Sequence, residues 1–369
     1  MSPLREILAR YVAAFRVIRA PVFLGFVPVF VLVWALVLMI QGDDVAVDFH
    51  HELYPQANLL LDGENPYPPP DSDLSDGTNS IWPTAAAALV APLALLPSGV
   101  ADGVMTALVI ACFLAALLVM GVRDWRVFGA AVLWPSFISA MQTANLTLPL
   151  CLLAALVWRY RDRRWIAGAA LGAALSLKFF LWPLLVWLAA LRRWRAVALA
   201  VTLAAASLLL ILPFESLVDY ARLLRNLSDT FDDKGYTPYG FLVETGAPES
   251  LSKIATYALG VALLLGAWTR RSFALAIAAA LVLSPIVWLH FFSVLALPLA
   301  AVAPRFRPIW LLPLLMFLAP GTENGDPWQS ALVLVLAAAL IAFALRHESG
   351  ATERAREPLD RRVPANEPT

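Results

Sequence analysis

The chain has 369 residues, of which 60% are hydrophobic and 15% are charged, and its mean hydropathy is +0.73. Soluble domains average about half apolar and about a quarter charged. This composition therefore argues against a soluble enzyme, a disordered chain or a nucleic-acid-binding protein, and it favours a lipid solvent. The formal net charge is zero, because 27 Lys and Arg balance 27 Asp and Glu. The two cysteines, Cys112 and Cys151, lie in apolar runs and predict neither a disulfide framework nor a metal cluster.

The first predicted element is a membrane-spanning helix over residues 22–40. No small-residue cleavage site follows it, so we interpret it as a retained helix rather than a signal peptide. Four arginines precede it, whereas no Lys or Arg occurs from Ala20 to Val122. The positive-inside rule then puts the N-terminus in the cytoplasm and the loop 41–81, with its nine acids, on the outer face.

The next apolar segment, residues 83–97, is short and bracketed by prolines. A full span here would invert all later segments relative to their charges. We therefore predict a re-entrant or interfacial helix.

Two longer apolar stretches, residues 127–158 and 165–191, each lie between basic connectors. Each stretch must leave and return to the same side, which predicts two hairpins of short or broken helices. Their outer turns are marked by Gln142 to Asn145 in the first hairpin and by Lys178 in the second. Broken helices suit a protein-lined cavity, since lipid does not tolerate irregular backbone.

The remaining apolar runs predict further spans, separated by two outer loops, 214–253 and 320–329. Together they give an all-α polytopic membrane protein of about 12 transmembrane helices, with a range of 10 to 13 and both ends cytoplasmic. Residues 1–345 form one transmembrane domain, and the polar segment 346–369 is expected to be a disordered cytoplasmic tail. The predicted later spans are 196–213, 254–268, 272–290, 291–303, 309–319 and 330–345.

A group of polar residues follows the first span. Asp48 lies near the bilayer between Val47 and Phe49, where burial would raise its pKa and suit it to act as a general base. A solvated acidic loop is the plain alternative. His50, His51 and Glu52 offer metal-ligating atoms, but adjacent residues rarely chelate one ion together, so we predict no metal site.

Lys178 is a cation inside an apolar run, and such a residue in a membrane is a functional candidate by default. Its natural partner is an anionic group such as a phosphate, and the alternative is a lysine that snorkels to the interface. His290 lies near the outer end of a predicted helix, where it would hydrogen-bond or face a phosphate. Gln142 and Asn145 fit helix–helix hydrogen bonding as well as ligand contact.

The outer loop 214–253 combines arginines with tyrosines. Arg222 and Arg225, near Tyr236 and Tyr239, fit either a sugar or phosphate surface or an ordinary amphipathic loop. The chain has no Walker loop, so ATP-driven transport is poorly supported.

A series of short motifs follows in order along the chain. They are Asp48-Phe49, Tyr54, Asn65-Pro66-Tyr67, Trp82-Pro83, Gln142 with Asn145, Lys178, Arg192-Arg193-Trp194-Arg195, and Ser284-Pro285 with Trp288 and His290. Taken in order, these motifs resemble glycosyltransferase family 87, whose members are polyprenol-phosphate-sugar-dependent enzymes of the C-type glycosyltransferase fold. The chain departs from the family pattern at Thr84, Met141, Phe179 and Phe291, where Pro, Gly, Pro and His are usual.

The resemblance implies a plasma-membrane hexosyltransferase with its active site on the outer face. A polyprenyl-phosphate sugar would be the donor and a glycolipid or polysaccharide the acceptor, with inversion at the sugar and no nucleotide, metal or other cofactor at the chemical step. Mannose and arabinofuranose both occur in the family, and we favour mannose. Asp48 would be the base, and Lys178 and His290, with Arg222 or Arg225, would hold the donor phosphate. Substrate contacts are expected from His51, Glu52, Tyr54, Gln142, Asn145 and Trp288.

Two other classes of function remain open. A lipid or sugar transporter or flippase is suggested by the broken helices and the intramembrane cation, although other charged residues at helix midpoints are scarce. A non-catalytic membrane scaffold would use the polar tail to bind partners.

Overall fold

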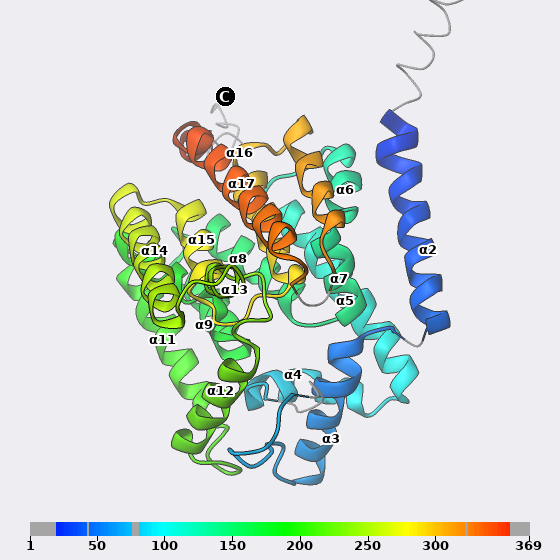
Figure 1. The fold of residues 1–369 in the computed structure, drawn as a ribbon, viewed down its shortest axis with the longest axis vertical. Helices are drawn as coiled ribbons and strands as arrows, with labels where there is room; N and C mark the ends of the chain where they lie inside the picture. Colours follow the sequence, from blue (N-terminus) through cyan, green and yellow to red (C-terminus); the bar gives the residue numbers. More distant parts are fainter. Residues whose placement is uncertain (1–19, 43, 76–80, 322–323, 355–369) are drawn as a thin grey trace, which may run out of the picture.

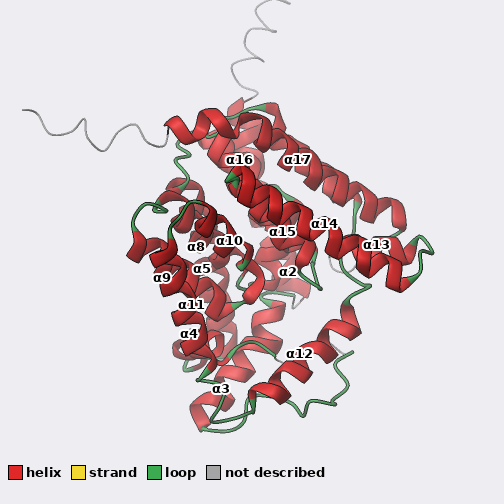
Figure 2. Cartoon of the chain, turned by 90° about the vertical axis from the view of Figure 1, so that its left-hand side faces the viewer, coloured by secondary structure: helices red, strands yellow, loops and turns green. Residues whose placement is uncertain are grey.

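A computed structural model describes residues 20–42, 44–75, 81–321 and 324–354. The arginines before the first span and residues 355–369 of the tail lie outside these ranges. Within them, every regular element is a helix (Figure 2). The predicted all-α polytopic fold is confirmed.

Four helical segments in the described residues are long and apolar enough to cross a membrane. The first joins η1 and α2 and matches the span predicted over residues 22–40. A fifth crossing results if the bent pair α7 and α8, which meet at 117°, counts as one. The bounds are Val22–Phe26 for η1, Val27–Gly42 for α2, Ser98–Val119 for α5, Pro135–Thr143 for α7, Thr147–Arg159 for α8, Glu249–Arg270 for α14 and Pro327–Arg354 for α17.

Seven further apolar segments have only 10–17 residues. At 1.5 Å per residue they reach about 15–26 Å, which is less than the roughly 30 Å of a bilayer core. None of these segments is therefore long enough to cross such a layer by itself as a straight helix. They are α4 (Thr84–Ala94), α9 (Arg164–Leu177), η3 with α10 (Phe179–Leu181 and Pro183–Ala190), α11 (Trp194–Leu208), α15 (Phe273–Leu283), η4 with α16 (Leu289–Leu295 and Ala296–Val302), and η5 (Pro308–Leu318).

The predicted hairpins are present as broken helices. The first breaks between α7 and α8, at residues 144–146, and the second breaks at Lys178, between α9 and η3. Segment 83–97 contains α4, whose 11 residues are too short to cross a bilayer. The remaining helices are η2 (Phe49–Leu53), α3 (Tyr54–Asp62), α6 (Trp125–Val132), α12 (Leu217–Phe231) and α13 (Pro238–Glu244).

The core lies around α7, α8, α15, η4 and α16. All residues of α15 from Phe273 to Leu281 are buried, as are all seven residues of η4. By contrast, Pro28 is the one buried residue of α2, which stands at the edge of the bundle (Figure 1). A helix that is apolar all round is stable at such an edge when lipid covers it.

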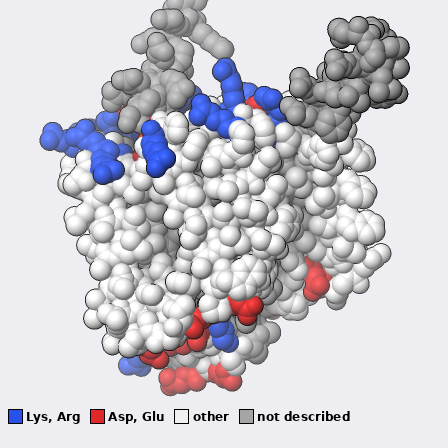
Figure 3. Space-filling view, turned by 45° about the horizontal axis from the view of Figure 1, so that its top comes forward, with Lys and Arg blue, Asp and Glu red and all other residues white. Residues whose placement is uncertain are grey.

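Charged side chains are sorted between the two ends of the molecule. Figure 3 shows Lys and Arg gathered at one end and most Asp and Glu at the other, with a belt of other residues between them. Helices α3 and α12 lie at the acidic end (Figure 1). The sorting matches the pattern expected from the sequence, and the cytoplasmic placement of the basic end stays a prediction.

The C-terminal helix is longer than expected. Helix α17 continues to Arg354, so residues 346–354 of the segment expected to be a disordered tail are helical. Ala, Glu and Arg are good helix formers and extend a helix that the membrane span has already nucleated.

Candidate active site

Two carboxyl side chains project from the turn that follows the first span. Asp48 immediately precedes the π-helical turn η2, and Glu52 lies four residues later within it. Phe49 and Leu53, with the same spacing, are fully buried and anchor this turn in the core. Side chains four residues apart lie on one face of such a turn, and π-helical turns are frequent at functional sites. The sequence thus fixes one apolar pair and one acidic pair on neighbouring faces.

The break between α7 and α8 connects Asp48 to His290. Ala144 adopts a left-handed conformation with φ 46°, which ends α7 and turns the chain into Asn145. The Asn145 side-chain oxygen accepts a hydrogen bond from the Thr147 amide at 2.8 Å, which fixes the orientation of the side chain. Its nitrogen then donates to Asp48 Oδ2 at 3.1 Å and lies 2.6 Å from His290 Nε2.

This arrangement assigns the protonation of the histidine. Because the Asn145 nitrogen carries only donors, His290 Nε2 acts as the acceptor. The imidazole is then neutral and carries its proton on Nδ1, which is the ring's donor. His290 is buried at 3% exposure and stacks on Phe291, with ring centroids 4.9 Å apart.

Lys178 enters the same cluster from the second helix break. Its ammonium nitrogen lies 4.6 Å from the centre of the Trp82 ring and 4.2 Å from that of Phe291. The Trp82 indole also donates to Glu52 Oε2 at 2.6 Å. The lysine is thus held over two aromatic faces and beside the carboxyl pair, which compensates part of the cost of a cation away from water.

Burial and charge act in opposite directions on the two carboxyls. Burial is the main cause that raises the pKa of Asp48, while the Asn145 hydrogen bond and the Lys178 charge lower it. Burial also raises the pKa of Glu52, and the negative charge of Asp48 raises it further. Glu52 therefore holds a proton to higher pH than Asp48, so Asp48 is the member of the pair that ionises first and is available to accept a proton.

Two predicted residues next to the pair have local partners. His51 is exposed and packs edge-on against His50, whose Nδ1 lies 2.8 Å from Asp102 Oδ2 on α5. Tyr54 donates its hydroxyl to the Leu96 carbonyl at 2.8 Å, which ties the start of α3 to the end of α4. These contacts hold η2 and α3 in place from both sides.

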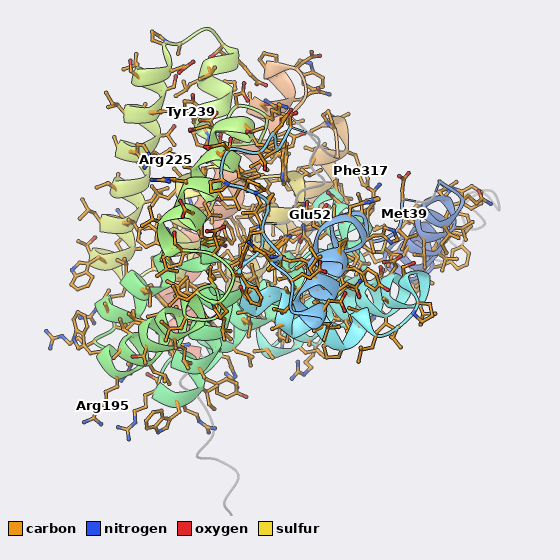
Figure 4. The ribbon with its side chains drawn as sticks, turned by 90° about the horizontal axis from the view of Figure 1, so that it is seen from below. Met39, Glu52, Arg195, Arg225, Tyr239 and Phe317 are labelled. Carbon is orange, nitrogen blue, oxygen red and sulfur yellow. The ribbon has the colours of Figure 1, made fainter. Side chains whose placement is uncertain are left out.

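The other predicted residues lie on α12, on α7 and just before η4. Arg222 is exposed and pairs with Asp219 in its own helix, 2.8 Å away. Figure 4 shows Glu52 near the centre of the acidic end and Arg225 apart from it on α12. Gln142 lies half-buried in the last turn of α7, and Trp288 packs edge-on against Phe231 at the end of α12.

Sequence reasoning missed two residues of the cluster. Trp82 appeared only as part of a family-like Trp-Pro pair, and Phe291 only as a departure from a usual histidine. In the structure both residues make the same contact, because the Lys178 ammonium lies over the ring of each. The one available signal for Trp82 was an aromatic residue next to Pro83, between the first predicted span and the segment 83–97.

The fold and the cluster define a polytopic, all-α membrane protein whose ionisable residues meet where its helices break. A model of glycosyltransferase family 87 matches residues 81–288, more than half of the chain, and the chain belongs to that family. It is therefore a membrane glycosyltransferase. No curated protein and no solved structure gives a significant match. Trp82, Asn145 and Lys178 lie inside the matched range, whereas Asp48 and His290 lie on either side of it.

Proposed function

We propose that the protein transfers mannose from a polyprenyl-phosphate-linked donor to a hydroxyl of a glycolipid or polysaccharide acceptor at the outer face of the plasma membrane. The supporting observation is that Asp48 and Lys178, 130 positions apart in the chain, interact within one cluster, in which Asn145 also joins Asp48 to His290. A base and a phosphate-neutralising cation side by side are what this transfer requires. The C-type glycosyltransferase architecture belongs to the same proposal.

In the proposed step, the Asp48 carboxylate accepts the proton of the acceptor hydroxyl. The hydroxyl oxygen attacks the anomeric carbon as the bond from that carbon to the phosphate oxygen breaks. Polyprenyl phosphate leaves with the electron pair, the proton stays on Asp48, and the configuration at the sugar inverts. The departing polyprenyl phosphate is a phosphate monoester and a good leaving group, so its developing negative charge needs a stabilising cation more than a strong acid.

Lys178 and His290 are the proposed phosphate contacts. Lys178 supplies the charge, and His290 donates from Nδ1, because its Nε2 already accepts from Asn145. Glu52, His51, Gln142 and Trp288 are proposed sugar or acceptor contacts, since each is carried by η2, α7 or the segment entering η4. Arg222 and Arg225 on α12 are proposed contacts for parts of the substrates that extend beyond the cluster.

The test is sugar transfer in membranes from a radiolabelled polyprenyl-phosphate mannose, comparing wild type, Asp48→Asn and Asp62→Asn. Asp62 is an exposed acid at the end of α3, fourteen positions after Asp48, and it serves as the matched control. Removing a general base typically costs about 10²- to 10⁴-fold, so Asp48→Asn should lose transfer while Asp62→Asn keeps it. Full transfer by a well-folded Asp48→Asn protein overturns Asp48 as the base. Uptake of the donor into vesicles without covalent product indicates a transporter instead.

A further inference from the structure

The basic end of the molecule contains an open hollow that the proposed reaction does not use. The hollow has a volume of about 760 Å³ and lies between the first turns of α9 and α11. It is lined by Asp162, Arg163, Arg164, Trp165, Ile166, Arg192, Arg193, Trp194, Arg195 and Ala196.

Close packing of the two helices holds the hollow in shape. A Cβ added to Gly168 would lie 2.9 Å from the Ala196 carbonyl oxygen, and one added to Gly172 would lie 2.8 Å from Leu203 Cβ. The small side chains at this four-residue spacing let the backbones of α9 and α11 approach each other. The helix starts are therefore held side by side, and the arginines of both surround the same space.

The charge around the hollow is strongly unbalanced. Five of its lining residues are arginines and one is an aspartate, Asp162, which pairs with Arg193. Within the described part of the chain, the other four arginines form no ion pair with a carboxylate. Arg163 and Arg164 instead lie over the rings of Tyr160 and Trp165. Figure 4 shows Arg195 at the outer edge of the bundle, and Figure 3 shows the blue residues gathered at this end.

Tryptophans mark the depth of the hollow in the membrane. Trp165 is the second residue of α9 and Trp194 is the first residue of α11, and they are 66% and 56% exposed. Exposed tryptophans with neighbouring cations are typical of the head-group level of a bilayer. Ile166, which is 38% exposed, continues the apolar surface along α9 toward the bilayer core.

We propose that this hollow binds the phosphate head group of an anionic phospholipid from the leaflet at the basic end. The planar forks of the arginines match phosphate oxygens, and the acyl chains would follow the apolar surface beside Trp165 and Ile166. A general excess of cations on one side of a membrane protein does not require a hollow. Here four arginines that have no carboxylate partner among the described residues line one hollow between two helices. The proposal uses the orientation inferred from the charges and is independent of the chemistry proposed for Asp48.

The test measures lipid retained by the purified protein in native mass spectrometry, after exchange into phosphatidylglycerol or phosphatidylcholine. The hollow variant is Arg192→Gln with Arg195→Gln. The matched control is Arg305→Gln with Arg307→Gln, two exposed arginines at the basic end that do not line the hollow. Wild type and control should retain one phosphatidylglycerol, the hollow variant should retain at least fivefold less, and none should retain phosphatidylcholine.

The proposal is overturned if the two double variants retain equal amounts of phosphatidylglycerol. It is also overturned if the wild type retains phosphatidylcholine as well as it retains phosphatidylglycerol. Release of the phosphatidylglycerol by inorganic phosphate also overturns it, because the hollow would then be a site for a free anion. A thermal melt of each variant checks that loss of lipid does not reflect loss of fold. Sugar transfer in detergent should be equal in the two double variants. A loss of lipid binding can therefore be told apart from a loss of the proposed sugar transfer.

Discussion

The Asn145 amide nitrogen lies 3.1 Å from the carboxyl of Asp48 and joins the residue before η2 to the break between α7 and α8. The same side chain is oriented by its hydrogen bond from the Thr147 amide, so its donor direction is set by the backbone. The carboxyl that we propose as base is therefore positioned from outside its own segment.

Asn145→Ala should lower transfer by about tenfold, because a hydrogen bond to a charged group contributes roughly 1.5 kcal/mol. The acid limb of its pH profile should also move to higher pH, since the lost bond is one of the causes that lower the pKa of Asp48. Kinetics of the purified enzyme over a pH range measure both effects. Asn58→Ala, which removes an amide on α3 that bonds only its own helix, is the control. An unchanged acid limb would remove Asn145 from the positioning of Asp48.

The pH dependence of the wild type follows from the raised pKa of Asp48. The base must be deprotonated to accept a proton, so kcat/KM should fall as pH drops through that pKa. Because burial raises it, the fall should begin well above the value of about 3.9 of an ordinary aspartate. An acid limb at the ordinary value would show that Asp48 is solvated during turnover.

Glu52→Gln should leave transfer near neutral pH within about threefold of wild type. Burial and the Asp48 charge raise the pKa of Glu52, so a neutral amide of the same shape mimics its protonated form, and its oxygen can still accept from Trp82. Initial rates at neutral pH, compared with those of Asp48→Asn, test this. The opposite ranking, with Glu52→Gln inactive and Asp48→Asn active, would exchange the roles of the two carboxyls.

The Trp82 ring has two functions that substitutions can separate. Trp82→Phe keeps a ring face near Lys178 but loses the donor to Glu52, whereas Trp82→Leu loses both. A desolvated cation–π contact contributes about 2 kcal/mol, so Trp82→Leu should raise the donor KM roughly thirtyfold and Trp82→Phe much less. Equal effects of the two substitutions would mean that the ring face does not hold the lysine.

Gly235→Ala should destabilise the protein. A Cβ there would lie 2.9 Å from the Val287 carbonyl oxygen, and Tyr236 donates its backbone amide to that same oxygen at 2.7 Å. Overpacking against rigid backbone costs about 1–3 kcal/mol, which a thermal melt in detergent would show as a lower Tm. The control is Gly103→Ala in the exposed face of α5, where no atom lies within 4 Å of the new Cβ and the melt should not fall.

Sequence reasoning located the ionisable members of the cluster because such residues stand out in an apolar chain. Asp48, Lys178 and His290 lie at points where apolar runs end or break, and polar groups in lipid need such places. The helix breaks themselves followed from the spacing of basic connectors, which leaves too many residues for one crossing and too few for two full ones.

The contacts among these residues could not be predicted in the same way. Trp82 joins Lys178 only through the tertiary fold, and no local pattern indicates which ring a lysine will contact. Arg222 looked available for substrate, but a carboxylate three residues earlier in the same helix pairs with it. Likewise, the polar composition from Arg346 onward predicted disorder, whereas a helix that the preceding apolar segment has already nucleated continues through Arg354.

Helix α9 has a consequence for the membrane in which the protein works. It begins at the basic end and is capped at its other end by Lys178, and its 14 residues measure about 21 Å. If α9 stands upright from one surface of a hydrocarbon layer of about 30 Å, the lysine lies roughly 9 Å short of the other surface. For the proposed reaction, the bilayer must then become thinner there or the phosphate of the proposed donor must move below the head-group plane, so turnover should depend on acyl-chain length and be fastest in bilayers of short-chain lipids.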